Sequence, residues 1–188
     1  MAGYAPAVAA VLFSGHMVDA PDRPEPRFPP DRVQQVRQDI SQVIEQIDDP
    51  EARAVSGLAC GGDLLFAEEW LKTGRGLRAF LPRPVEEFLD ESVRFAGEKW
   101  VASFHAAIAD PMVGVVGPDD EMLGLEEPHG ANNLRMLEAA RRQGGTIHGV
   151  FVWDGSGGDG PGGTQQLASE LIEAGGSVTI LDPNPKAG

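Results

Sequence analysis

Cysteine is almost absent from this chain, which has one, Cys60, among 188 residues. A single cysteine excludes a disulfide within the chain and favours a reducing compartment, so we expect a cytoplasmic protein. No apolar run reaches the roughly 20 residues that a transmembrane helix needs. No basic segment precedes the apolar N-terminal residues, as it would in a signal peptide. The sequence therefore predicts neither a membrane span nor a secretion signal.

Positive charge is also scarce. The chain has 15 lysines and arginines against 29 aspartates and glutamates, which gives a formal net charge of −14. Such a surface repels nucleic-acid backbones and anionic lipids, so we expect neither as the main partner. Any phosphate group must then be bound locally, by backbone amides or by a few arginines. With 41% hydrophobic and 23% charged residues, the composition is that of a folded globular protein.

Short apolar runs alternate with amphipathic segments along the chain. The expected strands are residues 8–14, 52–58, 77–81, 112–116, 147–153 and 177–181. The expected helices are residues 31–47, 64–72, 86–109 with a break at Gly97, 131–143 and 164–174. This alternation predicts an α/β fold of the Rossmann-like, doubly wound type, with a mainly parallel sheet of about six strands and helices on both faces. We expect residues 1–182 to form this single domain and residues 183–188 to be a C-terminal tail or linker.

The segment 55–71 is expected to contain a strand, a glycine-rich turn and the start of a helix. The glycines of the turn permit positive φ and let a ligand approach the backbone closely. The unpaired N–H groups and the positive dipole end of the helix favour a phosphate group. Asp63 is expected to be the N-cap of this helix, and it either only caps the helix or also contacts a ribose hydroxyl. The pattern indicates a nucleotide-type ligand.

Ligands of open parallel sheets bind beyond the carboxyl ends of the strands, so the residues there form the candidate site. Two glycine-rich turns, at 61–63 and 162–164, open helices and are expected to hold two parts of one phosphorylated ligand. The proline-rich loop 19–30 either supplies Arg27 as a phosphate clamp or is an ordinary surface loop. We expect no metal and no separate cofactor. The candidate ligand-binding residues are Ser14, Gly15, His16, Arg27, Gly57, Cys60, Gly61, Gly62, Asp63, Asn133, Asp154, Gly162, Gly163 and Thr164.

Two of these turns resemble those of known families. The segment 56–63, Ser-Gly-Leu-Ala-Cys-Gly-Gly-Asp, resembles the Ser-Gly-x-Ala-x-Gly-x-Asp turn of the DNA-processing protein A family. The segment 160–164, Gly-Pro-Gly-Gly-Thr, resembles the phosphate-binding Pro-Gly-Gly turn of the LOG (lysine-decarboxylase-like) phosphoribohydrolases. Both families belong to the SLOG superfamily of Rossmann-like nucleotide-binding and signalling domains. The resemblance implies a nucleotide-sensing module, and a homo-oligomer or a fused or partner effector domain is compatible with it.

The resemblance also bears on catalysis. LOG enzymes carry, within three residues of the threonine, a glutamate that serves glycosidic-bond cleavage. Here Thr164 is followed by Gln-Gln-Leu, and Glu170 is nearly two helical turns away. The sequence therefore favours nucleotide binding without turnover. Two alternatives stay open: an interaction domain with a vestigial pocket, or an enzyme that cleaves a nucleotide N-glycosidic bond with Glu68, Asp63 or Asp154 in place of that glutamate.

Overall fold

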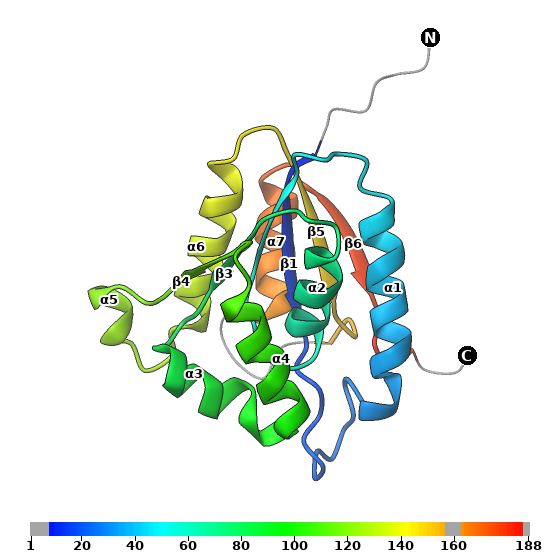
Figure 1. The fold of residues 1–188 in the computed structure, drawn as a ribbon, viewed down its shortest axis with the longest axis vertical. Helices are drawn as coiled ribbons and strands as arrows, with labels where there is room; N and C mark the ends of the chain where they lie inside the picture. The colour runs from blue at the N-terminus through cyan, green and yellow to red at the C-terminus, as the bar shows by residue number, and fades with distance from the viewer. Residues whose placement is uncertain (1–7, 157–162, 186–188) are drawn as a thin grey trace.

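The computed structural model describes residues 8–156 and 163–185. Six strands form one sheet in the order β4-β3-β2-β1-β5-β6, and every neighbouring pair is parallel (Figure 1). The predicted fold class and the six parallel strands are thereby confirmed. The strands are β1 (Val8–Gly15), β2 (Arg53–Ser56), β3 (Leu77–Phe80), β4 (Val113–Val116), β5 (Thr146–Val152) and β6 (Ser177–Leu181).

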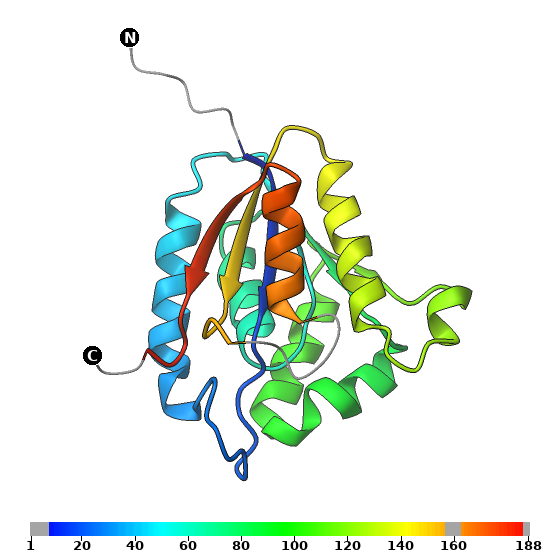
Figure 2. The same cartoon turned by 180° about the vertical axis from the view of Figure 1, so that it is seen from behind.

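Helices cover both faces of this sheet. Helices α1, α2 and α4 lie on the face toward the viewer in Figure 1, and α6 and α7 lie on the face seen in Figure 2. Two 3-10 helices, at Pro30–Arg32 and Arg94–Ala96, precede α1 and α4. The α-helices are α1 (Val33–Glu45), α2 (Gly62–Leu71), α3 (Val85–Ser92), α4 (Glu98–Ala109), α5 (Asp120–Leu123), α6 (His129–Arg141) and α7 (Thr164–Glu173).

The apolar sequence of β1 reflects its place in the middle of the sheet, between β2 and β5. Side chains of a strand alternate between the two faces. Val11 and Phe13 accordingly belong to the core under α1, α2 and α4, whereas Ala10 and Leu12 belong to the core under α6 and α7. The ring of Phe13 stacks on that of Phe66 from α2, with 4.3 Å between the ring centroids. A strand buried on both faces needs such a continuous apolar run.

Several helix boundaries differ from the prediction, most clearly at α2, α5 and α6. Helix α2 begins at Gly62, so its N-cap is Gly61, and the prediction that Asp63 caps this helix is wrong. Helix α6 begins at His129, with Pro128 as its N-cap. The short helix α5 lies in a segment predicted to be irregular, and the Oδ1 atom of Asp119 caps it by accepting a hydrogen bond from the N–H of Met122. The predicted break at Gly97 is confirmed by a φ of 103°.

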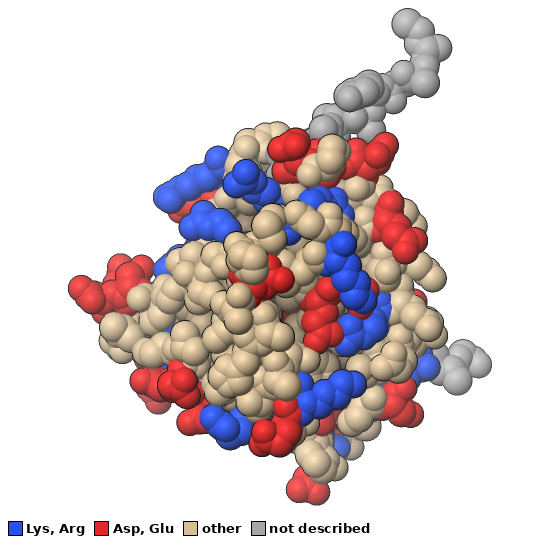
Figure 3. All heavy atoms as spheres, in the orientation of Figure 1, with Lys and Arg blue, Asp and Glu red and all other residues tan. Residues whose placement is uncertain are grey.

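The strand order reverses direction at β1. The chain adds β2, β3 and β4 on one side of β1 and then returns to add β5 and β6 on the other. In open parallel sheets, the carboxyl ends of the strands at such a reversal flank the ligand crevice. Acidic and basic side chains are interspersed on the face shown in Figure 3, with acidic groups around its margin. None of the helices in the described residues has the length and apolar character that crossing a membrane requires.

Candidate functional site

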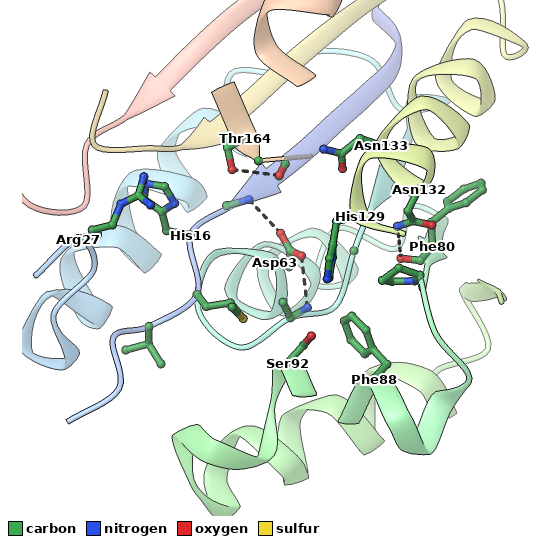
Figure 4. A pocket seen from close by; sticks show the side chains of 18 of the residues that line it. His16, Arg27, Asp63, Phe80, Phe88, Ser92, His129, Asn132, Asn133 and Thr164 are labelled. Atoms are coloured by element: carbon green, nitrogen blue, oxygen red, sulfur yellow. Dashed lines mark hydrogen bonds between the residues drawn. The ribbon is translucent and has the colours of Figure 1, made fainter. Parts of the chain in front are cut away.

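A cavity of about 420 Å³ opens at the carboxyl ends of β1, β2 and β3 (Figure 4). Its walls are the segment after β1, the first turn of α6, the start of α7, and residues of α3 and the following 3-10 helix. This is the edge of the sheet at which the sequence predicts the site. The predicted ligand-binding residues that line the cavity are Ser14, Gly15, His16, Arg27, Gly57, Asp63, Asn133, Gly163 and Thr164.

The other candidates lie elsewhere. Cys60 is fully buried in the core, and burial is the main cause that raises the pKa of its thiol to about 12, so the turn does not favour a thiolate. Gly61 and Gly62 lie behind the cavity wall, and Asp154 contacts two lining residues without lining the cavity itself. Gly162 lies outside the described residues.

The glycines of the turn before α2 allow a close contact within the chain. Gly61 has a φ of 94°, and a Cβ atom there would lie 2.5 Å from the backbone nitrogen of Val18 and 2.6 Å from the carbonyl oxygen of His16. A Cβ atom on Gly62 would lie 2.8 Å from the Cα of Gly15, and the Gly62 N–H donates to the His16 carbonyl at 3.0 Å. The end of β1 therefore fills the space that the sequence analysis assigns to a ligand at these two glycines.

The Asp63 carboxylate accepts hydrogen bonds from two backbone amides, one at the end of β1 and one just after β2. Its Oδ1 atom accepts a hydrogen bond from the Gly15 N–H at 3.0 Å, and its Oδ2 atom accepts one from the Ala59 N–H at 3.3 Å. A Cβ atom on Gly57 would lie 2.5 Å from Oδ2, so glycine is needed there for the carboxylate to fit. Burial is the main cause that raises the pKa of Asp63 to about 7, and the two amide hydrogen bonds oppose it.

This pKa predicts a pH dependence of stability. The Asp63 pKa is higher in the folded chain than in the unfolded one, so the folded chain binds more protons between about pH 4 and pH 7. This contribution to the free energy of unfolding is fully present below that window and is lost as the pH rises through it, by up to about 1.4 kcal/mol per pH unit. Asp63→Asn is expected to abolish this pH-dependent decrease in the free energy of unfolding, even if the substitution also changes the free energy at every pH.

Urea unfolding from pH 4.5 to 8 measures this dependence. The difference in free energy between wild type and Asp63→Asn isolates Asp63, because His16 and Asp154 titrate in both proteins. The exposed Asp22→Asn is the matched control and is expected to follow the wild-type profile. Parallel profiles of the wild type and Asp63→Asn would contradict the raised pKa.

A buried ion-pair cluster links the proline-rich loop to the ends of β1 and β5. The Asp154 carboxylate accepts hydrogen bonds from Nε and Nη2 of Arg27, both at 3.2 Å, and lies 3.0 Å from Nε2 of His16. Burial alone would raise the pKa of Asp154, but hydrogen bonds from Arg27, His16 and Ser156 outweigh it and hold the pKa well below its usual value. Burial is the main cause that lowers the pKa of His16, which favours the neutral imidazole. The charge of Arg27 is thus already balanced within the chain.

Hydroxyl and amide groups gather at one end of the cavity. The hydroxyls of Ser14 and Thr164 are 3.3 Å apart, and the buried Asn133 lies beside them in Figure 4. The N-cap of α7 is Gly163, which supplies no side chain to the first N–H groups of the helix. Donors of this kind at a helix N-terminus suit an anionic group.

The opposite end carries aromatic side chains, and the sequence analysis did not include it in the site. Phe80 and Phe88 lie there beside Ser92, and Phe95, which is 40% exposed, also lines the cavity (Figure 4). The sequence pattern assigns such apolar residues to the core. No local signal in the sequence shows whether an apolar side chain faces the core or a cavity. His129 and Asn132 from α6 also line the cavity, and Asn132 donates from Nδ2 to the Phe80 carbonyl at 3.2 Å.

The third acidic candidate for catalysis, Glu68, lies outside the cavity. Its carboxylate forms an ion pair of 2.6 Å with Arg37, between α2 and α1. In residues 8–156 and 163–185, no group of three or more histidine, cysteine, aspartate or glutamate side chains is arranged to hold a metal ion. Among the described residues, the groups that the cavity offers a ligand are therefore hydroxyls, amides, carboxylates, two imidazoles, two arginines and aromatic rings.

No protein-family model matches the chain, and a comparison with curated proteins found no match. Among solved structures, the chain is similar to DNA processing protein A from Streptococcus pneumoniae, with 16% identity and a TM-score of 0.40, over 92% of this chain and 58% of that one. It is also similar to Moco Carrier Protein from Chlamydomonas reinhardtii, with 11% identity and a TM-score of 0.33, over 94% of this chain and 91% of that one. The chain thus spans little more than half of the bacterial protein. These likenesses carry no argument about function, which we draw from the cavity.

Proposed function

We propose that the chain binds a nucleotide or a nucleotide derivative in this cavity without turning it over, as the ligand-sensing module of a signalling or effector system. The observation that carries the proposal is the division of one cavity into two chemically different ends. Hydroxyls and a helix N-terminus lie at one end, and aromatic side chains lie at the other. The volume of about 420 Å³ is within the usual range for small-molecule sites.

The polar end suits the phosphate of such a ligand. The first N–H groups of α7 and the hydroxyls of Ser14 and Thr164 are donors, and hydrogen bonds to a charged acceptor are stronger than neutral ones. The aromatic end suits a planar base, which packs favourably against the ring of Phe88. The ring of Phe80 is instead buried in the core beneath Arg78 and Arg135. The presence of hydrogen-bond donors at one end of the cavity and of an aromatic ring at the other supports a ligand that carries both a phosphate and a base.

The charges around the cavity favour a single phosphate over a triphosphate. Asp19, Asp63 and Glu127 line the cavity together with only two arginines, Arg23 and Arg27. The charge of Arg27 is balanced by Asp154, and Arg23 lies 3.5 Å from a carboxylate oxygen of Asp19. With no excess of positive charge, each further phosphate would add repulsion.

The ion pairs and hydrogen bonds that the acidic side chains already make support binding without turnover. A general base must be within hydrogen-bond reach of the proton that it removes. Glu68 is paired with Arg37 outside the cavity, and Asp154 is held by Arg27 and His16 behind its wall. Asp63 faces the cavity, and the hydrogen bonds that its two oxygens accept from backbone amides hold its carboxylate in one orientation, so the turnover assay below tests this residue directly.

Calorimetric titration with AMP and with adenosine tests the proposal. AMP is expected to bind, and Thr164→Val is expected to weaken AMP binding by about tenfold or more, because a hydrogen bond to a charged group contributes about 1.5–3 kcal/mol. The same variant should leave adenosine binding unchanged, since adenosine has no phosphate. Thr146→Val, at the opposite end of β5, makes the same chemical change outside the cavity and is the matched control.

Two results would contradict the proposal. If none of AMP, GMP, CMP and UMP binds, the interaction-domain alternative takes its place. If the free base or ribose phosphate appears during incubation with the bound nucleotide, the chain is a hydrolase. Equal losses of AMP affinity in Thr164→Val and Thr146→Val would remove the α7 end from the phosphate site.

A further inference from the structure

Asp63 lies between the two ends of the cavity. In Figure 4 its carboxylate lies between Thr164 on one side and Ser92 and Phe88 on the other. A nucleotide has the same order of parts, since its ribose joins the phosphate to the base. A ligand with its phosphate at α7 and its base against the phenylalanines would therefore place its ribose beside Asp63.

The Asp63 carboxylate is held in a fixed orientation by its two backbone donors. The amides of Gly15 and Ala59 come from the ends of different strands, and each binds a different carboxylate oxygen. Above its pKa of about 7 the Asp63 carboxyl is ionised and offers about four acceptor positions, so about one position on each oxygen is left after these bonds. The two carboxylate oxygens can therefore accept hydrogen bonds from two adjacent donor groups of a ligand. Because the carboxylate is already held in one plane, less side-chain entropy is lost on binding.

We propose that Asp63 recognises the 2′- and 3′-hydroxyls of the ligand's ribose, an inference that rests on the proposed function. The hydroxyls donate to Oδ1 and Oδ2 from the side opposite the Gly15 and Ala59 amides. A phosphate beside Asp63 would be repelled by the carboxylate, which supports placing the phosphate at α7. The site thus selects ribonucleotides over deoxyribonucleotides.

Titration of the wild-type protein with AMP, 2′-deoxy-AMP and 3′-deoxy-AMP, at a pH well above the Asp63 pKa of about 7 so that the carboxylate is ionised, tests this inference. Each deoxynucleotide is expected to bind about tenfold or more weakly than AMP, because each lacks one hydrogen bond to a charged acceptor. This comparison uses the unmodified protein, so it does not depend on whether a variant folds.

The variant Asp63→Asn tests whether Asp63 recognises the ribose hydroxyls or only supports the turn before α2. With one oxygen replaced by a donor, the preference for AMP over 2′-deoxy-AMP or over 3′-deoxy-AMP is expected to fall to about twofold or less. Glu127→Gln makes the same carboxylate-to-amide change at another cavity residue and is expected to keep both preferences. A merely supporting role for Asp63 would weaken all three ligands together and leave the ratios unchanged.

The outcomes distinguish this inference from the proposed function. Equal binding of AMP and both deoxynucleotides to the wild-type protein would overturn the ribose contact while leaving nucleotide binding intact. Equal binding of these three, together with tighter binding of GMP than of IMP, would assign Asp63 to the amino edge of the base and also overturn it. Failure of every nucleotide to bind would instead contradict the proposed function.

Discussion

Gly61→Ala is expected to lower the free energy of unfolding by about 2–6 kcal/mol, because two costs add at this position. Gly61 has a φ of 94° and a ψ of −128°, a region essentially restricted to glycine, where a residue with a Cβ atom is strained by about 1–3 kcal/mol. The new Cβ atom would also lie 2.5 Å from a backbone nitrogen and 2.6 Å from a carbonyl oxygen. Both atoms belong to the main chain after β1 and cannot turn away as a side chain can, and overpacking of this kind costs about 1–3 kcal/mol.

Gly74→Ala is the matched control for Gly61→Ala. Gly74 also has a positive φ, of 75°, but a Cβ atom there would have no neighbour within 4 Å. This variant should lose only the conformational part, about 1–2 kcal/mol. Chemical denaturation of both variants measures the difference. Equal losses would show that the segment after β1 moves aside readily, and that Gly61 is not needed for the close contact between that segment and α2.

Arg27→Ala is expected to lower the free energy of unfolding by about 2–4 kcal/mol, below the range of about 3–5 kcal/mol for a fully buried ion pair because this pair is only partly buried. The side chains of Arg27 and Asp154 are 11% and 15% exposed. Without the guanidinium, the Asp154 carboxylate would keep its contacts with His16 and Ser156 but lose its charged partner. The pKa of Asp154 should then rise toward its usual value, because the hydrogen bonds from Arg27 contribute to holding it low.

Arg23→Ala is the control for Arg27→Ala, since both arginines line the cavity and lie in the same loop. The Arg23 side chain is 31% exposed and lies 3.5 Å from Asp19, so its loss should cost less than about 1 kcal/mol. Denaturation of these two variants, of Asp154→Ala and of Arg27→Ala/Asp154→Ala completes the comparison. If the double variant is no more stable than the sum of the single losses predicts, the two side chains are not coupled and the expected cost of Arg27→Ala has another origin.

The main features of the fold follow from local sequence signals. The apolar run at β1, the i, i+3, i+4 pattern of α1 and the glycine at position 97 each specify their structure within a short window. The boundaries of α2 and α6 do not, because tertiary contacts fix them. Gly62 can start α2 early because the His16 carbonyl accepts its N–H, and this contact joins segments that are far apart in the sequence.

The site could be predicted only in outline. The rule that ligands bind at the carboxyl ends of parallel strands brings Ser14, Gly15 and Thr164 to one edge, and all three line the cavity. The sequence could not reveal that the Asp63 carboxylate occupies the amides of the first turn, nor that Arg27 pairs with Asp154, a residue 127 positions away. Both contacts depend on the crossing of separate loops, which leaves no periodic signal.

The central position of β1 has a consequence for synthesis on the ribosome. Of the six strands of this sheet, β1 emerges before the others. β2 can pair with one of its edges soon afterwards, but its other edge stays unpaired until β5 is made. At the usual rates of translation, the interval between Gly15 and Thr146 lasts on the order of ten seconds. During that time, the apolar sequence of β1 presents unpaired backbone groups of the kind that promote association between nascent chains. The nascent chain is therefore expected to need a chaperone most while the segment between β2 and β5 is being made.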